Sequence, residues 1–131
     1  MSDVTGLGQV ALTVRDVPRS VEFYRDAVGL RFLFDAGPTL AFLDLGGVRL
    51  MLTAPEGDFT PGSGTVLYLR VADIDRAYDA LRSQRVAFVD EPHLIARMPD
   101  HDLWMAFFSD PDGHTLALMQ EAPKGYVPVA P

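Results

Sequence analysis

Residues 107–118, FFSDPDGHTLAL, place a cluster of turn-forming residues between two apolar runs. Pro111 pre-sets a turn dihedral, and the carboxylates of Asp110 and Asp112 can accept hydrogen bonds from nearby backbone. Gly113 tolerates a positive φ, which a sharp reversal requires. The stretch therefore predicts a β-hairpin.

The hairpin has a counterpart in the first half of the chain. Residues 47–52, GVRLML, can be laid over residues 113–118, GHTLAL, and residues 14–17, VRDV, over residues 71–74, VADI. An internal repeat of this length implies two copies of one supersecondary unit, each with a sheet covered by its own helix. The remaining sheet faces can then enclose a cavity.

Alternation and helical spacing predict the order βαβββ in both halves. In the first half we expect strands at 9–14, 30–35, 39–45 and 48–53 and a helix at 17–28. In the second half we expect strands at 65–71 and 86–89, a helix from 74 to about 84, a link over 90–104 and the hairpin. The fold class is α+β, and one domain spans residues 1–131, with modules at about 6–54 and 65–121, a linker at 55–64 and a tail at 122–131.

Composition excludes several classes of protein. The chain has 131 residues, a net charge of −7 and no cysteine. The acidic balance argues against nucleic acid and acidic membranes as partners, and the missing thiols exclude disulfides and sulfur metal ligands other than methionine. No apolar run is long enough to span a bilayer, and Met1–Asp3 opens no targeting segment, so we expect a soluble, cytoplasmic protein.

Several of these segments resemble the vicinal oxygen chelate superfamily, which includes glyoxalase I, bleomycin resistance proteins and extradiol dioxygenases. The resemblance covers roughly residues 6–121. It is carried by five segments of the sequence, VALTVRD at 10–16 running into SVEFY at 20–24, GL at 29–30, VADID at 71–75 and DPDG at 110–113. It implies paired βαβββ modules around a cup-like, sheet-lined cavity, but not a particular reaction.

The resemblance also locates the metal ligands of metal-dependent members, on the first and fourth strands of each half. The corresponding positions here are Gln9, Met51, Val66 and Ala117. Only Gln9 offers a good donor, and a lone amide cannot hold a hard or borderline divalent ion. We therefore expect no metal and no other cofactor. A strand register shifted by one residue would present Arg49, Leu50, Leu67 and Leu116, which is no better.

The segment 90–104 carries the remaining polar candidates. His93 and His101 could act as general acid or base, and Asp100 or Asp102 could orient His101. A displaced metal site of His93, His101 and Glu91 is an alternative on donor type alone. A structural role, with the histidines as turn and loop residues, is the third interpretation.

Ligand contacts are expected from Gln9, Met51, Tyr68, Trp104 and Ala117. Alternation points the Tyr68 hydroxyl toward the cavity, where it could bond a ligand or fill space. Trp104 could grip a planar ligand or pack in the core.

Three functional hypotheses follow. The first is a metal-free protein that binds a small, partly apolar organic molecule. The second is a lyase or isomerase of the glyoxalase kind that uses His101 or His93, or a displaced metal. The third is a protein-interaction scaffold. Relatives commonly assemble as dimers, and exposed strand edges favour pairing, so we also expect a homodimer.

Overall fold

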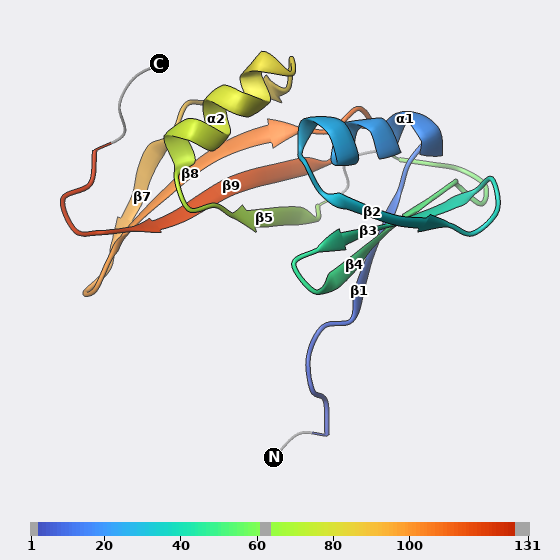
Figure 1. The fold of residues 1–131 in the computed structure, drawn as a ribbon, viewed down its shortest axis with the longest axis horizontal. Helices are drawn as coiled ribbons and strands as arrows, with labels where there is room; N and C mark the ends of the chain where they lie inside the picture. The colour runs from blue at the N-terminus through green and yellow to red at the C-terminus, as the bar shows by residue number, and fades with distance from the viewer. Residues whose placement is uncertain (1–2, 61–63, 128–131) are drawn as a thin grey trace. The chain divides into compact units, whose positions relative to one another are not determined.

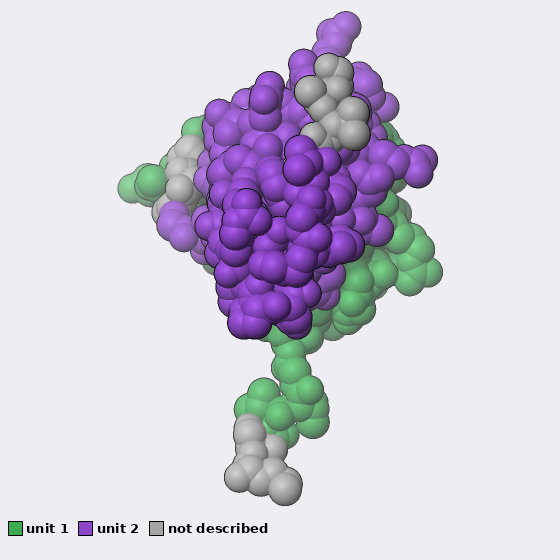
Figure 2. Space-filling model, turned by 90° about the vertical axis from the view of Figure 1, so that its left-hand side faces the viewer, with its two compact units in different colours: residues 1–61 green, residues 62–131 purple. Residues whose placement is uncertain are grey.

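The computed structural model describes residues 3–60 and 64–127, which belong to two compact units, residues 1–61 and 62–131 (Figure 2). The boundary between the units falls inside the stretch 55–64, where proline and glycine predicted a connection. Each unit has a helical segment lying over one face of its own mixed sheet (Figure 1).

Unit 1 follows the predicted order. Its elements are β1 (Gln9–Thr13), α1 (Val17–Glu22), η1 (Phe23–Ala27), β2 (Arg31–Asp35), β3 (Leu40–Leu45) and β4 (Val48–Thr53). The sheet order is β1-β4-β3-β2, with β1 parallel to β4 and the other neighbours antiparallel. Helix α1 packs on β3 and β4, where Leu43, Leu50 and Leu52 are fully buried.

The helix predicted over 17–28 divides into two parts. Asp16 caps its start, accepting a bond from the Arg19 N–H at 3.1 Å. From Phe23 onward the turns widen to a π-helix, in which the Val28 N–H reaches the Phe23 carbonyl at 3.0 Å. Gly29, at φ 89°, then ends the helical segment, as the sequence indicated.

Strand β2 carries a β-bulge at Leu33. Phe32 pairs with Leu43 and Phe34 with Phe42, so Leu33 is the extra residue on the edge strand. The alternation of side chains along β2 is therefore interrupted.

Unit 2 contains one strand more than predicted. Its elements are β5 (Val66–Arg70), α2 (Ile74–Ser83), β6 (Ala87–Phe88), β7 (His93–Arg97), β8 (Asp102–Ser109) and β9 (Thr115–Ala122). The sheet order is β5-β9-β8-β6, and β7 also pairs with β8. The interpretation of 90–104 as a mere link was wrong, because the long β8 pairs with β6 near one end and with β7 near the other.

The predicted hairpin is confirmed, with β8 and β9 as its antiparallel strands. The Asp110 carboxylate accepts bonds from the backbone N–H groups of Asp112, at 2.9 Å, and of His114, at 2.8 Å. Gly113 adopts φ 83°. The turn is thus closed by the side chain and the glycine that predicted it.

The segment after β9 is anchored to the start of β8. The buried carboxylate of Asp102 accepts bonds from Lys124 Nζ at 2.8 Å and from the Gly125 N–H at 3.0 Å. The Tyr126 ring then packs edge-on against Trp104, with centroids 6.0 Å apart. The part of the predicted tail up to Tyr126 is therefore held against unit 2.

None of the helices within the described ranges has the length and apolar character needed to cross a membrane.

Candidate functional site

In each unit the sheet face opposite the helix, here called the helix-free face, carries most of the predicted site residues. In unit 1, Gln9 and Met51 lie together on this face, with Gln9 Nε2 3.6 Å from Met51 Sδ. Met51 pairs with Phe42, whose ring stacks on Phe34 at 4.7 Å. The Arg49 guanidinium lies 5.8 Å from the Phe42 centroid. The face combines aromatic surface with one cation and one amide.

The helix-free face of unit 2 is centred on Tyr68. Tyr68 pairs with Ala117 on β9, and Ala117 pairs with Phe107 on β8. The Tyr68 and Phe107 rings meet edge to face, with centroids 6.2 Å apart, and Tyr68 is 51% exposed. The phenol therefore stands over an apolar patch and remains accessible.

The strand registers of the two units match. Ala11 pairs with Met51 in unit 1 as Tyr68 pairs with Ala117 in unit 2. Gln9 and Val66, which lie two positions earlier on their strands, are therefore equivalent as well. The equivalence read from the repeat agrees with the hydrogen-bonded sheets.

This donor set does not fit a divalent metal ion. Gln9 supplies one neutral amide, which already lies beside the Met51 thioether, while Val66 and Ala117 supply no donor. Zn²⁺ takes three or four nitrogen, sulfur or oxygen ligands, and Mg²⁺ or Ca²⁺ takes six or more oxygens. The four family positions of this chain cannot provide such a set.

His101 lies at the end of the helix-free face of unit 2. Its Nδ1 is 2.8 Å from Asp100 Oδ1, and its Nε2 is 3.5 Å from Glu121 Oε2. Glu121 lies on β9, on the same face as Ala117 by alternation. The pKa of Asp100 is lowered, chiefly by its hydrogen bond to His101. The ring is thus oriented by a carboxylate, as an acid–base residue would be.

His93 shares the helix-free face but lies apart from His101. It pairs with Met105, and its Nδ1 is 2.9 Å from the Glu91 carbonyl and 3.7 Å from Asp90 Oδ2. His101 precedes β8, so the two rings lie roughly 13 Å apart along the strand at about 3.3 Å per residue. Within residues 3–60 and 64–127, no group of three or more His, Asp and Glu side chains is placed to hold a metal ion.

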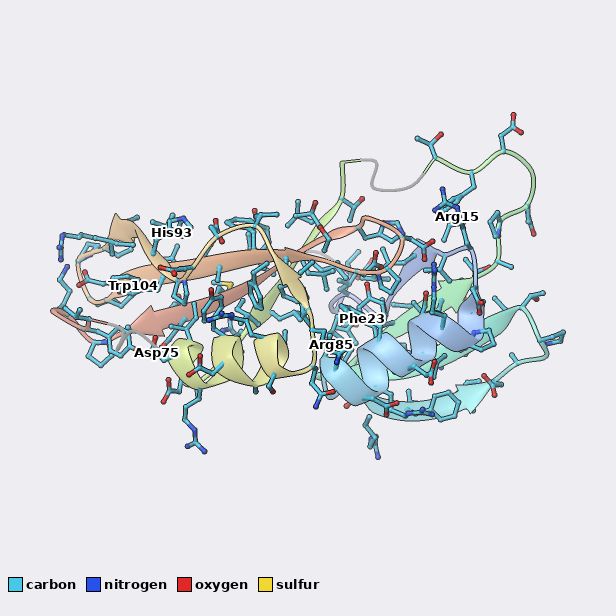
Figure 3. All side chains as sticks on the ribbon, turned by 90° about the horizontal axis from the view of Figure 1, so that it is seen from above. Arg15, Phe23, Asp75, Arg85, His93 and Trp104 are labelled. Carbon is cyan, nitrogen blue, oxygen red and sulfur yellow. The ribbon has the colours of Figure 1, made fainter. Side chains whose placement is uncertain are left out.

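Trp104 lies on the other face of the sheet from Tyr68 and Ala117. It pairs with Gln120, whose Oε1 accepts the Ile74 N–H at the start of α2, so both side chains are on the helix-covered face. Its ring contacts Tyr126, and its buried Nε1 has no hydrogen-bond partner among the described residues. Figure 3 shows Trp104 and His93 toward the same end of the unit 2 sheet.

The sequence interpretation did not assign four side chains on these faces as ligand contacts. Phe34, Phe42 and Arg49 belong to unit 1, and Phe107 belongs to unit 2. Alternation from Met51 and Ala117 along paired strands could have found Phe42 and Phe107, once the register was known. Phe34 could not be placed in this way, because the bulge at Leu33 changes the face of the residues that follow it.

Comparisons with known proteins agree with this fold. The model of the family described as Glyoxalase/Bleomycin resistance protein/Dioxygenase superfamily matches residues 6–118. The uncharacterized protein YraH of Bacillus subtilis (strain 168) is 30% identical over 126 residues, which cover 84% of this chain and 94% of that protein.

A second relative is the metallothiol transferase FosB of Staphylococcus epidermidis, 28% identical over 121 residues, which cover 88% of this chain and 83% of that protein. Among solved structures, a member of the Glyoxalase/bleomycin resistance protein/dioxygenase superfamily from Sphaerobacter thermophilus DSM 20745 superposes with a TM-score of 0.75 at 24% identity. That superposition covers 90% of this chain and 98% of the other, and it shows a shared fold.

Proposed function

The chain belongs to the Glyoxalase/Bleomycin resistance protein/Dioxygenase superfamily, and from that premise we propose that it binds a small, partly apolar organic molecule without a metal ion. The observation that carries the proposal is the donor set. Of the four strand positions at which the resemblance would put metal ligands, Met51 supplies only a weak thioether, and Val66 and Ala117 supply nothing. The proposed ligand-binding residues are Gln9, Met51, Tyr68 and Ala117.

The helix-free faces support this kind of ligand. Binding sites for organic molecules are largely apolar and aromatic, with a few polar groups that orient the ligand. The rings of Phe42 and Phe107 supply apolar area, while Gln9 and the Tyr68 hydroxyl supply hydrogen bonds. Arg49, which lies over Phe42, adds a cation that could pair with an acidic group.

The experiment is a titration with 8-anilino-1-naphthalenesulfonate, a planar, apolar anion whose fluorescence rises on binding. We expect saturable binding that is unchanged by EDTA. Tyr68→Ala should weaken binding to the helix-free face of unit 2, and Phe42→Ala binding to that of unit 1, each by about tenfold, the effect of losing roughly 1.4 kcal/mol of contact. Val89→Ala, which removes another exposed side chain, 73% accessible, is the matched control. Binding that EDTA abolishes and Zn²⁺ restores would contradict the proposal.

A second candidate function is a lyase or isomerase that uses His101 as acid or base, with His93 as a further candidate. The short contact between His101 Nδ1 and Asp100 favours it. The likeness to proteins named metallothiol transferase adds thiol transfer to the reactions to be tested. Turnover of carbonyl–thiol adducts or epoxides should fall at least about a hundredfold in His101→Ala. Turnover that survives this substitution would remove His101 from the mechanism.

We also propose that the chain forms a homodimer, because exposed strand edges in such units favour pairing. Light scattering should then give twice the chain mass of 14.4 kDa. A mass of one chain would refute the dimer and leave the ligand proposal standing.

A further inference from the structure

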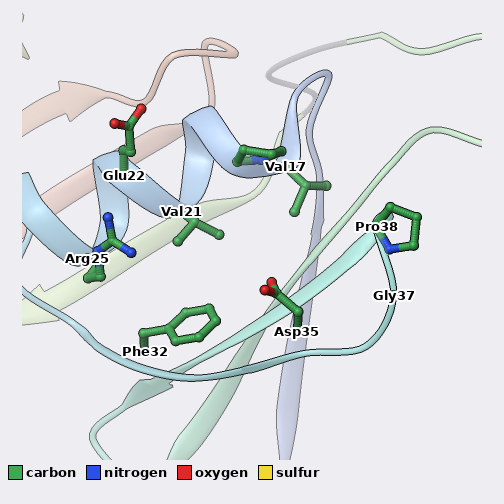
Figure 4. A pocket seen from close by; sticks show the side chains of 9 residues that line it. Val17, Val21, Glu22, Arg25, Phe32, Asp35, Gly37 and Pro38 are labelled. Carbon is green, nitrogen blue, oxygen red and sulfur yellow. The ribbon is translucent and has the colours of Figure 1, made fainter.

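Unit 1 contains a cavity of about 570 Å³ on the helix side of its sheet, away from the helix-free face (Figure 4). One wall is helical, with Val17 and Val21 on α1 and Arg25 on η1. The other wall is the edge strand β2, with Phe32 and Asp35. The volume is in the range of small-molecule sites. We call this cavity the unit 1 groove.

An irregularity in the edge strand builds one wall of the groove. Phe32 and Asp35 are an odd number of residues apart, so a regular strand would point them to opposite faces. The bulge at Leu33 restores them to the same face, because Phe32 pairs with Leu43 and Asp35 pairs with Ala41, and both partners are buried under the helix. Bulges commonly re-aim side chains in this way beside functional sites.

The helical wall is irregular as well. Arg25 lies in the π-helical turn η1, and such turns are frequent at functional sites. Its guanidinium is held by Asp26 through two bonds, of 2.8 and 3.0 Å. The charge of Arg25 is therefore already matched by a neighbouring carboxylate.

The other charged groups that line the groove are two carboxylates, Glu22 and Asp35. In the part of the chain that the structure describes, the Asp35 carboxylate has no hydrogen-bond or ion-pair partner. Figure 4 shows it directed into the space below Val17 and Val21, beside the Phe32 ring. Val17 and Val21 are only 6% and 7% exposed, so the part of the helical wall that faces the Asp35 carboxylate is apolar.

Unit 2 has a groove at the equivalent place, lined by residues of α2 and β6. Tyr78 and Arg82 of α2 stand at the same distances from the N-cap Asp73 as Val21 and Arg25 do from Asp16. In unit 2 the Arg82 guanidinium lies 5.2 Å from the Tyr78 ring centroid, and the cavity is about 410 Å³. The smaller Val21 accompanies the larger cavity of unit 1.

We propose that the unit 1 groove binds a small organic ammonium ion. Its amine would donate a charge-assisted hydrogen bond to Asp35, and its apolar body would lie on Val21 and Phe32. An ammonium over the face of Phe32 would gain a further cation–π contribution. This site uses none of the residues of the helix-free faces. The ammonium proposal can therefore be tested separately from the ligand proposed for those faces.

The test is a titration with benzylammonium, followed by NMR of the valine methyl groups, with neutral benzyl alcohol as the comparison ligand. We expect saturable shifts at Val17 and Val21, with an affinity for benzyl alcohol lower by about tenfold, since hydrogen bonds to charged groups are the stronger ones. Asp35→Asn should remove that preference. Val21→Tyr, which copies the residue of unit 2, should abolish the shifts at Val17.

Glu91→Gln, which changes a carboxylate lining the groove of unit 2, is the matched control and should leave the affinity unchanged. Asp35 is exposed at the end of β2, so its replacement by the isosteric amide is expected to leave the fold intact. Equal affinities for benzylammonium and benzyl alcohol, no change in Asp35→Asn, or shifts confined to valines outside the groove would each overturn the proposal.

Discussion

Units 1 and 2 have the same central strand pairing but differ in the helix and in the strands at the edge of the sheet. In both units a parallel pair of strands carries the equivalent positions Gln9 and Val66 and the equivalent positions Met51 and Ala117. Unit 1 follows its short α-helix with a π turn and bulges its edge strand. Unit 2 has a regular helix, Ile74–Ser83, and adds a strand and an anchored segment after β9. The repeat therefore determines the strand pairing that both units share. The departures from the repeat produce the surfaces in which the two units differ.

The largest effect is expected in the core of unit 2. Phe108 is buried against Phe88, which in turn contacts Tyr78, with ring centroids 5.1 and 4.6 Å apart. Phe108→Ala should lower the free energy of unfolding by about 3–5 kcal/mol, because it opens a cavity among these rings. Amide exchange should accelerate most in unit 2. An equal acceleration in unit 1 would contradict the division into two units, and Phe34→Ala, at an exposed ring, is the matched control.

The next largest effect on stability is expected where the segment after β9, which has no counterpart in unit 1, is anchored to Asp102. The pKa of Asp102 is lowered, first by the hydrogen bond from Lys124 and then by that from the Gly125 backbone. Because the folded pKa lies below the unfolded value of about 3.9, the stabilisation is present above that pH and is lost as the pH falls through the folded pKa. Asp102→Asn should lower the Tm at pH 7 and separate Tyr126 from Trp104.

The fluorescence of Trp104, the only tryptophan, reports this separation directly. In the native protein the same spectral change should appear on acidification below about pH 4. An Asp102→Asn variant whose Tm falls equally far below the native value at pH 2 and at pH 7 would refute the role of the carboxylate. Asp100→Asn, with its carboxylate on the exposed neighbouring turn, is the control.

A smaller effect on the free energy of unfolding is expected from glycine substitutions in the two hairpin turns. Gly113 has φ 83° in the β8–β9 turn, and Gly46 and Gly47 have φ 63° and 96° in the β3–β4 turn. An alanine would meet no neighbouring atom at any of the three positions, so the cost is that of the backbone conformation alone. Each change to Ala should lower the free energy of unfolding by about 1–2 kcal/mol in a denaturant titration. A clearly larger loss at Gly113 would indicate that this turn does more than reverse the chain.

These comparisons also explain how much the sequence could predict. Capping residues such as Asp16 and Asp73, and the turn residues around Gly113, act locally, so the elements and the repeat could be read from them. The bulge at Leu33 and the π turn at Phe23 depend on tertiary packing. The groove that they line could therefore not be predicted from the sequence. Strand β7, HLIAR, was missed because polar and turn-forming residues flank its short apolar run on both sides, and the run becomes a strand only by pairing with β8.

The same division applies to the candidate site. Gln9, Met51, Tyr68 and Ala117 could be placed on helix-free faces by alternation, because alternation holds along regular strands. Trp104 could not be placed from pattern, because its face depends on the register of β8 against β9 and on Tyr126 from outside the sheet.

Our central proposal concerns the ligand positions of both units. It is that this chain has the sheets of the superfamily fold but does not bind a metal ion at these positions. Elemental analysis of the purified native protein, after dialysis without chelator, tests it most directly. We predict less than about one-tenth of an equivalent of Zn, Ni, Fe or Mn per chain, because one amide and one thioether cannot retain a divalent ion. One tightly bound ion per chain would contradict the account.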